Sequence, residues 1–91
     1  MRITVWKLCA AMRATRDFLS TRDPGQGDDE QAVRALVALT GLSRAVVIDR
    51  LAWKYLQTWM CVPSDTRLYF DHGSAELIYD LLKEAGRSEA A

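Results

Sequence analysis

The chain has 91 residues, of which 49% are hydrophobic, and its 12 basic and 12 acidic side chains give a formal net charge of zero. A chain of this length forms one domain with a small core. Its neutral charge counts against a free-standing nucleic-acid-binding protein, because such proteins are usually basic. The three Trp and three Tyr residues either fill the core or leave an apolar surface patch, and such patches usually contact a partner.

The cysteines and the apolar runs exclude further classes of protein. Cys9 and Cys61 are too few and too far apart for a disulfide framework or a zinc site, so we expect buried free thiols in a reducing compartment. The first apolar run is short and is interrupted by Lys7, unlike a signal peptide. No run approaches the length of a membrane span, so the sequence predicts a cytoplasmic protein without a membrane partner.

The first predicted element is a helix over residues 3–20. Its apolar positions recur at helical spacing, and the main stripe contains Val5, Leu8, Met12 and Leu19. A short strand over Ile3 to Trp6 is the alternative, because these residues also favour strands. Arg13 and Arg16 share another face of the helix. Pro and Gly residues then predict a loop over residues 20–27.

Two more helices follow, joined by a short turn. Asp28 or Asp29 is a suitable N-cap for the second helix, and Gly41 occupies the position of a left-handed C-cap. Ser43 caps the third helix, which extends to about Trp59. The apolar positions expected in the core are Ala32, Val33, Leu36 and Leu39 in the second helix, and Val47, Ile48, Leu51, Ala52, Tyr55 and Trp59 in the third.

The C-terminal third is predicted to contain a hairpin and a helix. Strand-favouring residues on both sides of Pro63 predict a short β-hairpin near residues 59–70. Asp71 to Ser74 is expected to form a second turn before a helix that Gly86 ends. Its predicted buried face contains Leu77, Ile78, Leu81 and Leu82.

These elements predict a mainly α fold of about four helices, with a helix-turn-helix-like central pair and the short hairpin. Residues 1–86 are expected to form one compact domain, and residues 87–91 a disordered tail.

The central pair over residues 33–56 carries the most information about function. A Gly-containing turn joins its two helices, and Ser43-Arg44 begins the second. The run from Gly41 to Leu56 resembles the second helix of ribbon-helix-helix repressors, with paired apolar positions and a Tyr-Leu end. That resemblance implies a DNA-contacting strand before the first helix of the pair. Residues 1–6 or 16–22 would have to provide it.

The same region also resembles a winged helix-turn-helix, in which the third helix reads DNA and the hairpin forms the wing. Although the total charge is zero, basic side chains are concentrated in residues 1–22 and 31–67 and can form one positive face. The side chains expected to contact DNA are Arg13, Arg16, Arg44, Arg50, Lys54 and Arg67. An ordinary helical hairpin with a solvated charged face fits the pattern equally well.

Catalytic signals are weak. His72 is the only histidine, and it neighbours Asp71 and Ser74 in sequence without the separation of an arranged triad. No cluster of metal-ligating residues and no Gly-rich phosphate loop is present in the sequence. We therefore predict a protein that is not an enzyme and that uses no cofactor, metal or small-molecule substrate.

The sequence thus leaves two functions open. The first is a small DNA-binding transcriptional regulator. The alternative is a protein-binding inhibitor or adaptor, for example a phage-encoded protein of the anti-CRISPR type. Interfaces of the second kind usually centre on Trp, Tyr or Arg, and the expected interface residues are Trp6, Val46, Trp53 and Tyr79. A homodimer is compatible with both functions.

Overall fold

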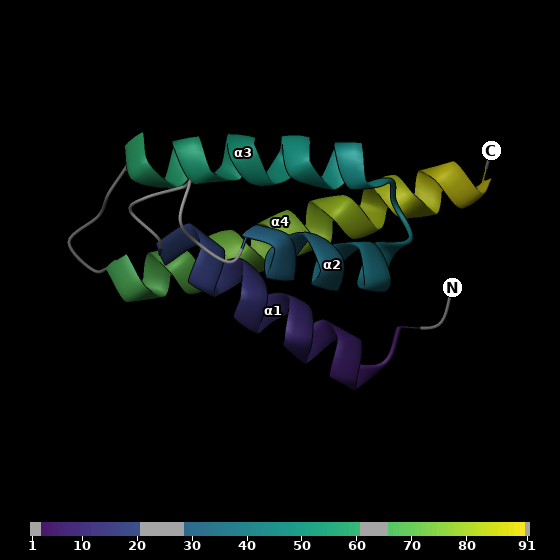
Figure 1. The fold of residues 1–91 in the computed structure, drawn as a ribbon, viewed down its shortest axis with the longest axis horizontal. Helices are drawn as coiled ribbons and strands as arrows, with labels where there is room; N and C mark the ends of the chain where they lie inside the picture. The colour runs from purple at the N-terminus through teal and green to yellow at the C-terminus, as the bar shows by residue number, and fades with distance from the viewer. Residues whose placement is uncertain (1–2, 21–28, 61–65, 91) are drawn as a thin grey trace.

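The computed structural model describes residues 3–20, 29–60 and 66–90. They form four helices, α1 (Val5–Ser20), α2 (Asp29–Thr40), α3 (Arg44–Met60) and α4 (Thr66–Ala90). In Figure 1, α3 lies along the top with α2 below it, α1 crosses at the bottom, and α4 passes behind. The 25 residues of α4 extend about 37 Å, so this helix accounts for most of the 39 Å length of the molecule. The predicted mainly α fold of four helices is confirmed.

Helix α1 starts at Val5 because Thr4 caps it. The backbone N–H of Lys7 donates to Thr4 Oγ1 at 3.2 Å, and the N–H of Leu8 donates to the Thr4 carbonyl at 3.0 Å. The threonine side chain thus satisfies an N–H group that the first turn leaves without a partner. Val5 and Trp6 are helical, so the alternative of a strand over residues 3–6 is wrong.

The connection between α2 and α3 is a turn of three residues, 41–43, in which Gly41 and Ser43 occupy the cap positions that the sequence predicts. Gly41 has a φ of 74°, and its N–H donates to the Val37 carbonyl at 2.8 Å. Ser43 caps α3 by accepting a bond from the Val46 N–H at 3.3 Å. Glycine adopts this φ without the steric strain that a Cβ atom causes. Across the turn the chain direction changes by 119° between Glu30–Thr40 and Arg44–Thr58.

The β-hairpin predicted near residues 59–70 is wrong where the structure describes this region. Residues 59 and 60 belong to α3 and residues 66–70 to α4, while residues 61–65 lie outside the described part. Strand propensity is weak compared with the packing of an amphipathic helix. The partly buried Phe70 is one of the residues that packing holds in the helix.

The turn predicted over residues 71–74 is also wrong, because α4 passes through it without a break. Gly73 is buried where α4 approaches α1 and α3. A Cβ atom at this position would lie 3.5 Å from Leu19 Cδ1 and 3.7 Å from Thr58 Oγ1. The glycine therefore sits at a helix crossing. The predicted helix end at Gly86 is wrong as well, since α4 continues to Ala90 and, among the described residues, positive φ is confined to Gly41.

The core lies between α1, α2 and α4, with one side of α3 packed on top. All four apolar positions predicted for α2 are buried, and Leu77, Ile78 and Leu81 of α4 join them. Small residues, Ala11 and Ala14, face inward from α1. The Ser74 hydroxyl donates to the Met12 carbonyl at 3.2 Å, which fixes α4 against α1.

Residues 21–28, which hold the predicted loop after Ser20 and the possible N-cap Asp28, lie outside the described part of the structure. Cys61 lies outside it as well. Cys9 is exposed on α1, so the prediction that this thiol is buried is wrong. Its position follows from α1 burying only the stripe that faces α2 and α4.

Candidate functional site

Helix α3 has two sides with different environments. The inner side contacts the rest of the chain, and there Val47, Leu51 and Thr58 are buried. The outer side leaves Ile48 and Leu56 half exposed. Ile48 and Ala52 were predicted to be in the core, and this prediction is wrong. The reason is that α3 is apolar on both sides, and only one side faces the core.

The exposed apolar side chains of α3 share one side of the helix, which we call the α3 apolar face. At 3.6 residues per turn, its members span about 140° of the helix circumference. Among the described side chains of this arc, the charged one is Asp49. The members are Ala45, Ile48, Ala52, Trp53, Leu56 and Met60, all exposed.

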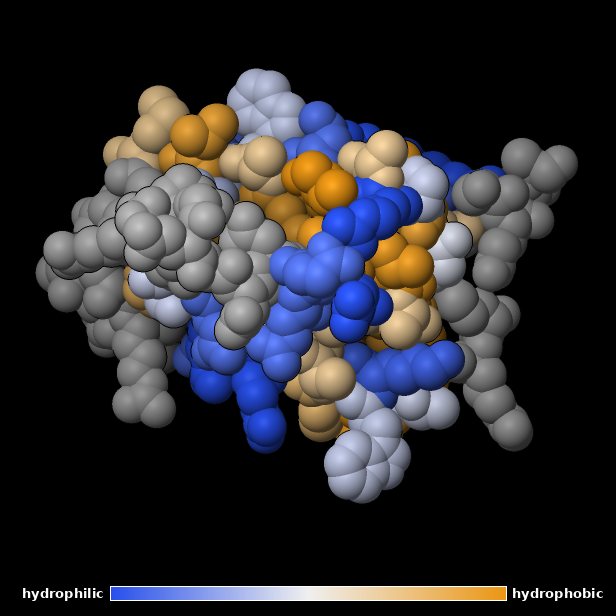
Figure 2. All heavy atoms as spheres, in the orientation of Figure 1, coloured by the Kyte–Doolittle hydropathy of each residue, from blue (hydrophilic) through white to orange (hydrophobic). Residues whose placement is uncertain are grey.

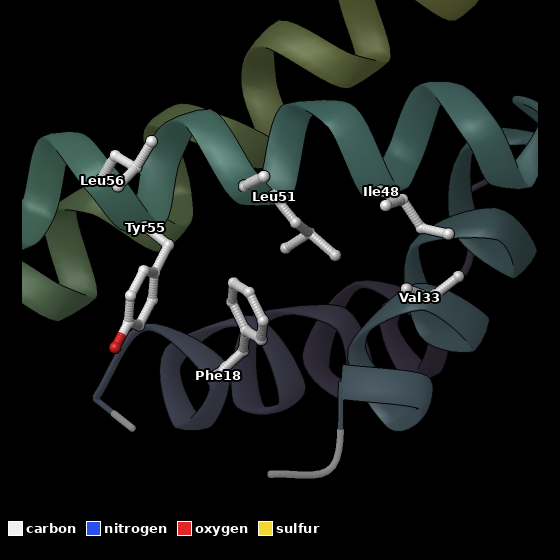
Figure 3. A pocket seen from close by; sticks show the side chains of 7 residues that line it. Phe18, Val33, Ile48, Leu51, Tyr55 and Leu56 are labelled. Carbon is white, nitrogen blue, oxygen red and sulfur yellow. The ribbon is translucent and has the colours of Figure 1, made fainter. Parts of the chain in front are cut away.

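An apolar groove of about 360 Å³ adjoins this face. Phe18 of α1 and Val33 of α2 form one wall, and α3 forms the other (Figure 3). The α3 wall contains Ile48, Leu51, Ala52, Tyr55 and Leu56. We call these seven residues the α3 groove.

Phe18 provides the α1 part of the groove wall. In Figure 3 its ring points from α1 up toward α3, beside Leu51 and Tyr55. The Phe18 and Tyr55 rings are tilted by 59°, with centroids 5.6 Å apart, a favourable aromatic geometry. Figure 2 shows hydrophobic side chains reaching the surface in the upper part of the view, where α3 runs. The groove and the face adjoin, because Ile48, Ala52 and Leu56 belong to both.

Four of the six cations predicted to contact DNA are paired with carboxylates in the described structure. Arg44 Nη1 donates to Glu30 Oε1 at 2.7 Å, and Arg34 Nε donates to the same oxygen at 3.2 Å. The hydrogen bond from Arg44 is the main cause that lowers the pKa of Glu30 below its ordinary value of 4.5. Arg44 therefore joins the start of α3 to the first turn of α2.

Arg50 and Lys54 point toward α4. Arg50 donates to Glu84 at 3.1 and 3.3 Å and to Asp49 at 2.6 Å, and the bonds to Glu84 raise the pKa of Arg50. Lys54 Nζ donates to Glu76 Oε1 at 2.6 Å. That bond lowers the pKa of Glu76. Both cations thus hold α4 against α3.

The remaining predicted DNA contacts lie elsewhere. Arg16 of α1 pairs with Asp71 of α4 at 3.4 Å, and Arg13 is exposed on α1. The side chain of Arg67 lies outside the described part. Within the described residues, the structure therefore does not bring these cations together as one unpaired basic face.

The predicted interface residues are also distributed over several helices. Trp6 is exposed near the start of α1, and Tyr79 is exposed on α4, where Lys83 Nζ lies 5.2 Å from its ring centroid. Val46 is half-buried. Of the four, Trp53 belongs to the α3 apolar face. Sequence reasoning missed the other members, although a helix with apolar residues on two sides was the available signal.

The residues considered for catalysis lie on α4 in different environments. His72 Nε2 lies 3.4 Å from Glu76 Oε2 on the surface of α4, and Ser74 is buried with its hydroxyl on the Met12 carbonyl. In the part of the chain that the structure describes, no three His, Cys, Asp or Glu side chains are grouped to hold a metal ion.

Comparisons with protein-family models, with curated proteins and with solved structures find no match to this chain. Within the described ranges, no single helix is both long and apolar enough to cross a membrane. The α2–α3 pair reaches that length and apolar character only jointly, across its 119° bend.

Proposed function

We propose that this protein is a non-enzymatic protein-binding module that binds its partner on the α3 apolar face. The observation that carries the proposal is that α3 presents apolar side chains on the side away from its own core. Apolar surface that a chain leaves exposed in one patch usually marks a site that a partner buries. The partner would complete that burial.

The face has the composition of an interface centre. Trp is among the residues that contribute most to binding energy, and Trp53 is 61% exposed. Removing a Leu or Ile side chain from water contributes about 1.5–3 kcal/mol when it is fully exposed at first, and Ile48 and Leu56 are half exposed. The cations beside the face, Arg50 and Lys54, are neutralised by Glu84 and Glu76, so they attract anionic ligands less strongly.

The test compares two aromatic residues of equal exposure. Proteins captured from a lysate by the immobilised chain are identified, purified and titrated calorimetrically against the wild type and two variants. Trp53→Ala is expected to weaken binding at least about 30-fold, the effect of a hot spot of 2 kcal/mol. Tyr79→Ala, which removes a side chain that is also 61% exposed, serves as the control.

A second variant makes the test sharper. Leu56→Asp places a charge on the face without disturbing a buried residue, so it should abolish binding while the circular dichroism spectrum stays unchanged. The proposal is rejected if Trp53→Ala and Leu56→Asp both keep the affinity of the wild type. This applies to self-association and to the binding of every captured protein.

DNA binding is the second candidate, and the geometry of α2 and α3 favours it. A three-residue turn and a change of direction of 119° lie within the range of helix-turn-helix pairs. Against it, the outer side of α3 offers apolar side chains where a recognition helix needs polar ones. Binding to duplex DNA that weakens steeply with salt, and that weakens further in Arg44→Glu, would support this function. Absence of binding at low salt excludes it.

A further inference from the structure

We infer that the partner on the α3 apolar face is a second copy of this chain, in a two-fold dimer whose α3 helices cross at Ala52. The inference rests on the proposed function, since it names the protein that occupies the same face. Four features of the face carry it: the matching of ridge and groove, a small central residue, the distribution of charge, and the exposed area.

Ridge and groove lie side by side on the same helix. Ile48, Ala52 and Leu56 follow at intervals of four residues and form one ridge of α3. The α3 groove runs beside this ridge, between it and Phe18 and Val33. A ridge of one copy can therefore enter the groove of the other. A two-fold axis repeats the contact in both directions, as in isologous dimers.

The central residue of the ridge permits close approach. Ala52 is the small residue between the larger Ile48 and Leu56, so two helices crossing at Ala52 can approach to the 8–10 Å typical of packed helices. In an antiparallel crossing, Ile48 of one copy lies against Leu56 of the other. The two large side chains then fill the space on either side of the crossing.

The charges favour an uncharged occupant. The chain has a net charge of zero, so two copies approach without net repulsion. Asp49, the charge within the arc, is paired with Arg50 at 2.6 Å. Arg50 and Lys54 are directed inward to Glu84 and Glu76. A strongly acidic or basic segment would find no complementary charge in the groove, whereas the neutral α3 ridge requires none.

The exposed area predicts a weak dimer. The four large side chains of the face are 46% to 81% exposed and present roughly 400 Å² of apolar surface per copy. A standard interface buries about 800 Å² per partner. With the rims added, the contact lies near the lower limit for specific association, so we expect a weak dimer whose population depends on concentration.

The first experiment measures the mass of the full chain by sedimentation. Concentrations from about 1 µM to about 1 mM cover the range in which a weak dimer forms. The mass of the wild type should rise from monomer to dimer and stop there. Ala52→Glu places two like charges at the crossing and should raise the dissociation constant at least about 100-fold. Ala75→Glu, at an exposed alanine of α4, is the matched control and should dimerise like the wild type.

The second experiment tests the crossing point. In a background of Cys9→Ser and Cys61→Ser, Ala52→Cys should form a disulfide between copies under mild oxidation. Backbones of helices packed at 8–10 Å can approach to disulfide distance at the crossing. Ala75→Cys should remain monomeric on a non-reducing gel.

The outcomes separate the inference from the proposed function. A wild type that stays monomeric at every concentration, or an Ala52→Glu variant that dimerises like the wild type, overturns the dimer. If a captured partner of another sequence then binds through Trp53 and Leu56, the proposed function stands without the dimer. If neither self-association nor binding of a captured partner depends on the α3 apolar face, the dimer and the proposed function are both wrong.

Discussion

The two sides of helix α3 both carry apolar residues but have different neighbours. On the side toward α4, Arg50 and Lys54 each meet a carboxylate of the same chain. On the outer side, Ile48 and Leu56 meet no covering helix in the described structure. The side of α3 that meets its own chain thus combines buried Val47 and Leu51 with cations paired to α4, whereas the side on which we place the partner is exposed and mostly apolar.

The largest expected effect comes from truncating equivalent leucines on the two sides. Leu51 is 2% exposed and Leu56 is 53% exposed. Leu51→Ala should lower the free energy of unfolding by about 2–5 kcal/mol, because it leaves a cavity in the core. Leu56→Ala should change it by no more than about 0.5 kcal/mol. Urea titration at micromolar protein concentration measures both. Equal losses would show that the outer side is already packed in the monomer.

The next prediction concerns Gly73 and Gly41. Substitution by alanine should change the free energy of unfolding in opposite directions at these two positions. Gly73→Ala should stabilise the fold by about 1 kcal/mol through helix propensity, since the new Cβ makes only ordinary contacts at 3.5 and 3.7 Å. Gly41→Ala should destabilise it by about 1–2 kcal/mol, because the φ of 74° strains any other residue. Thermal unfolding of both variants decides; a destabilising Gly73→Ala would mean a tighter crossing than the distances indicate.

A smaller effect follows from the pair between Lys54 and Glu76. The pKa of Glu76 is lowered below its ordinary value of 4.5, so the carboxylate stabilises the fold above that value and the contribution is lost as the pH falls through the lowered pKa. Glu76→Gln should cost less than about 1 kcal/mol at pH 7, since Glu76 is half exposed.

This difference from the wild type should disappear at the acid end of a pH series of urea titrations. Tyr79→Ala is the control, because it removes an exposed side chain of the same helix and leaves the pair intact. A Glu76→Gln deficit that persists below the lowered pKa contradicts the assignment.

The smallest effect is expected for the exposed pair of Arg44 and Glu30. Arg44→Gln should lower the melting temperature slightly in dilute buffer and not measurably in 1 M salt, because salt screens exposed charges. Leu56→Gln, a polar substitution on the apolar side, should show no such salt dependence. A salt-insensitive loss in Arg44→Gln would indicate that its stem, and not its charge, holds α2 to α3.

Local chemistry explains why much of the fold is predictable. Gly41 ends α2 because a residue without a side chain adopts the left-handed conformation easily. Ser43 starts α3 because its hydroxyl accepts a hydrogen bond from a backbone N–H of the first turn. The single apolar stripe of α2 is buried at all four predicted positions. Where a helix has one apolar side, periodicity identifies its buried face.

The rest depends on tertiary contacts. For α3, periodicity assigns Ile48 and Leu51 to one stripe and cannot say which side meets the core. At Gly73, turn propensity opposes helix formation, and the contacts with α1 and α3 decide. The carboxylate partners of Arg44, Lys54 and Arg50 lie 14, 22 and 34 positions away. Such partners are beyond the three- and four-residue spacings that a helix reveals locally.

The bond from Ser74 to the Met12 carbonyl links residues 62 positions apart, and this separation has a consequence for synthesis. A ribosome adds about 5–20 residues per second, so α1 waits roughly 3 to 12 seconds for the helix that covers it. During that interval its inward alanines are available to chaperones and to neighbouring nascent chains. The last helix to be translated therefore sets the moment at which the newborn chain can fold.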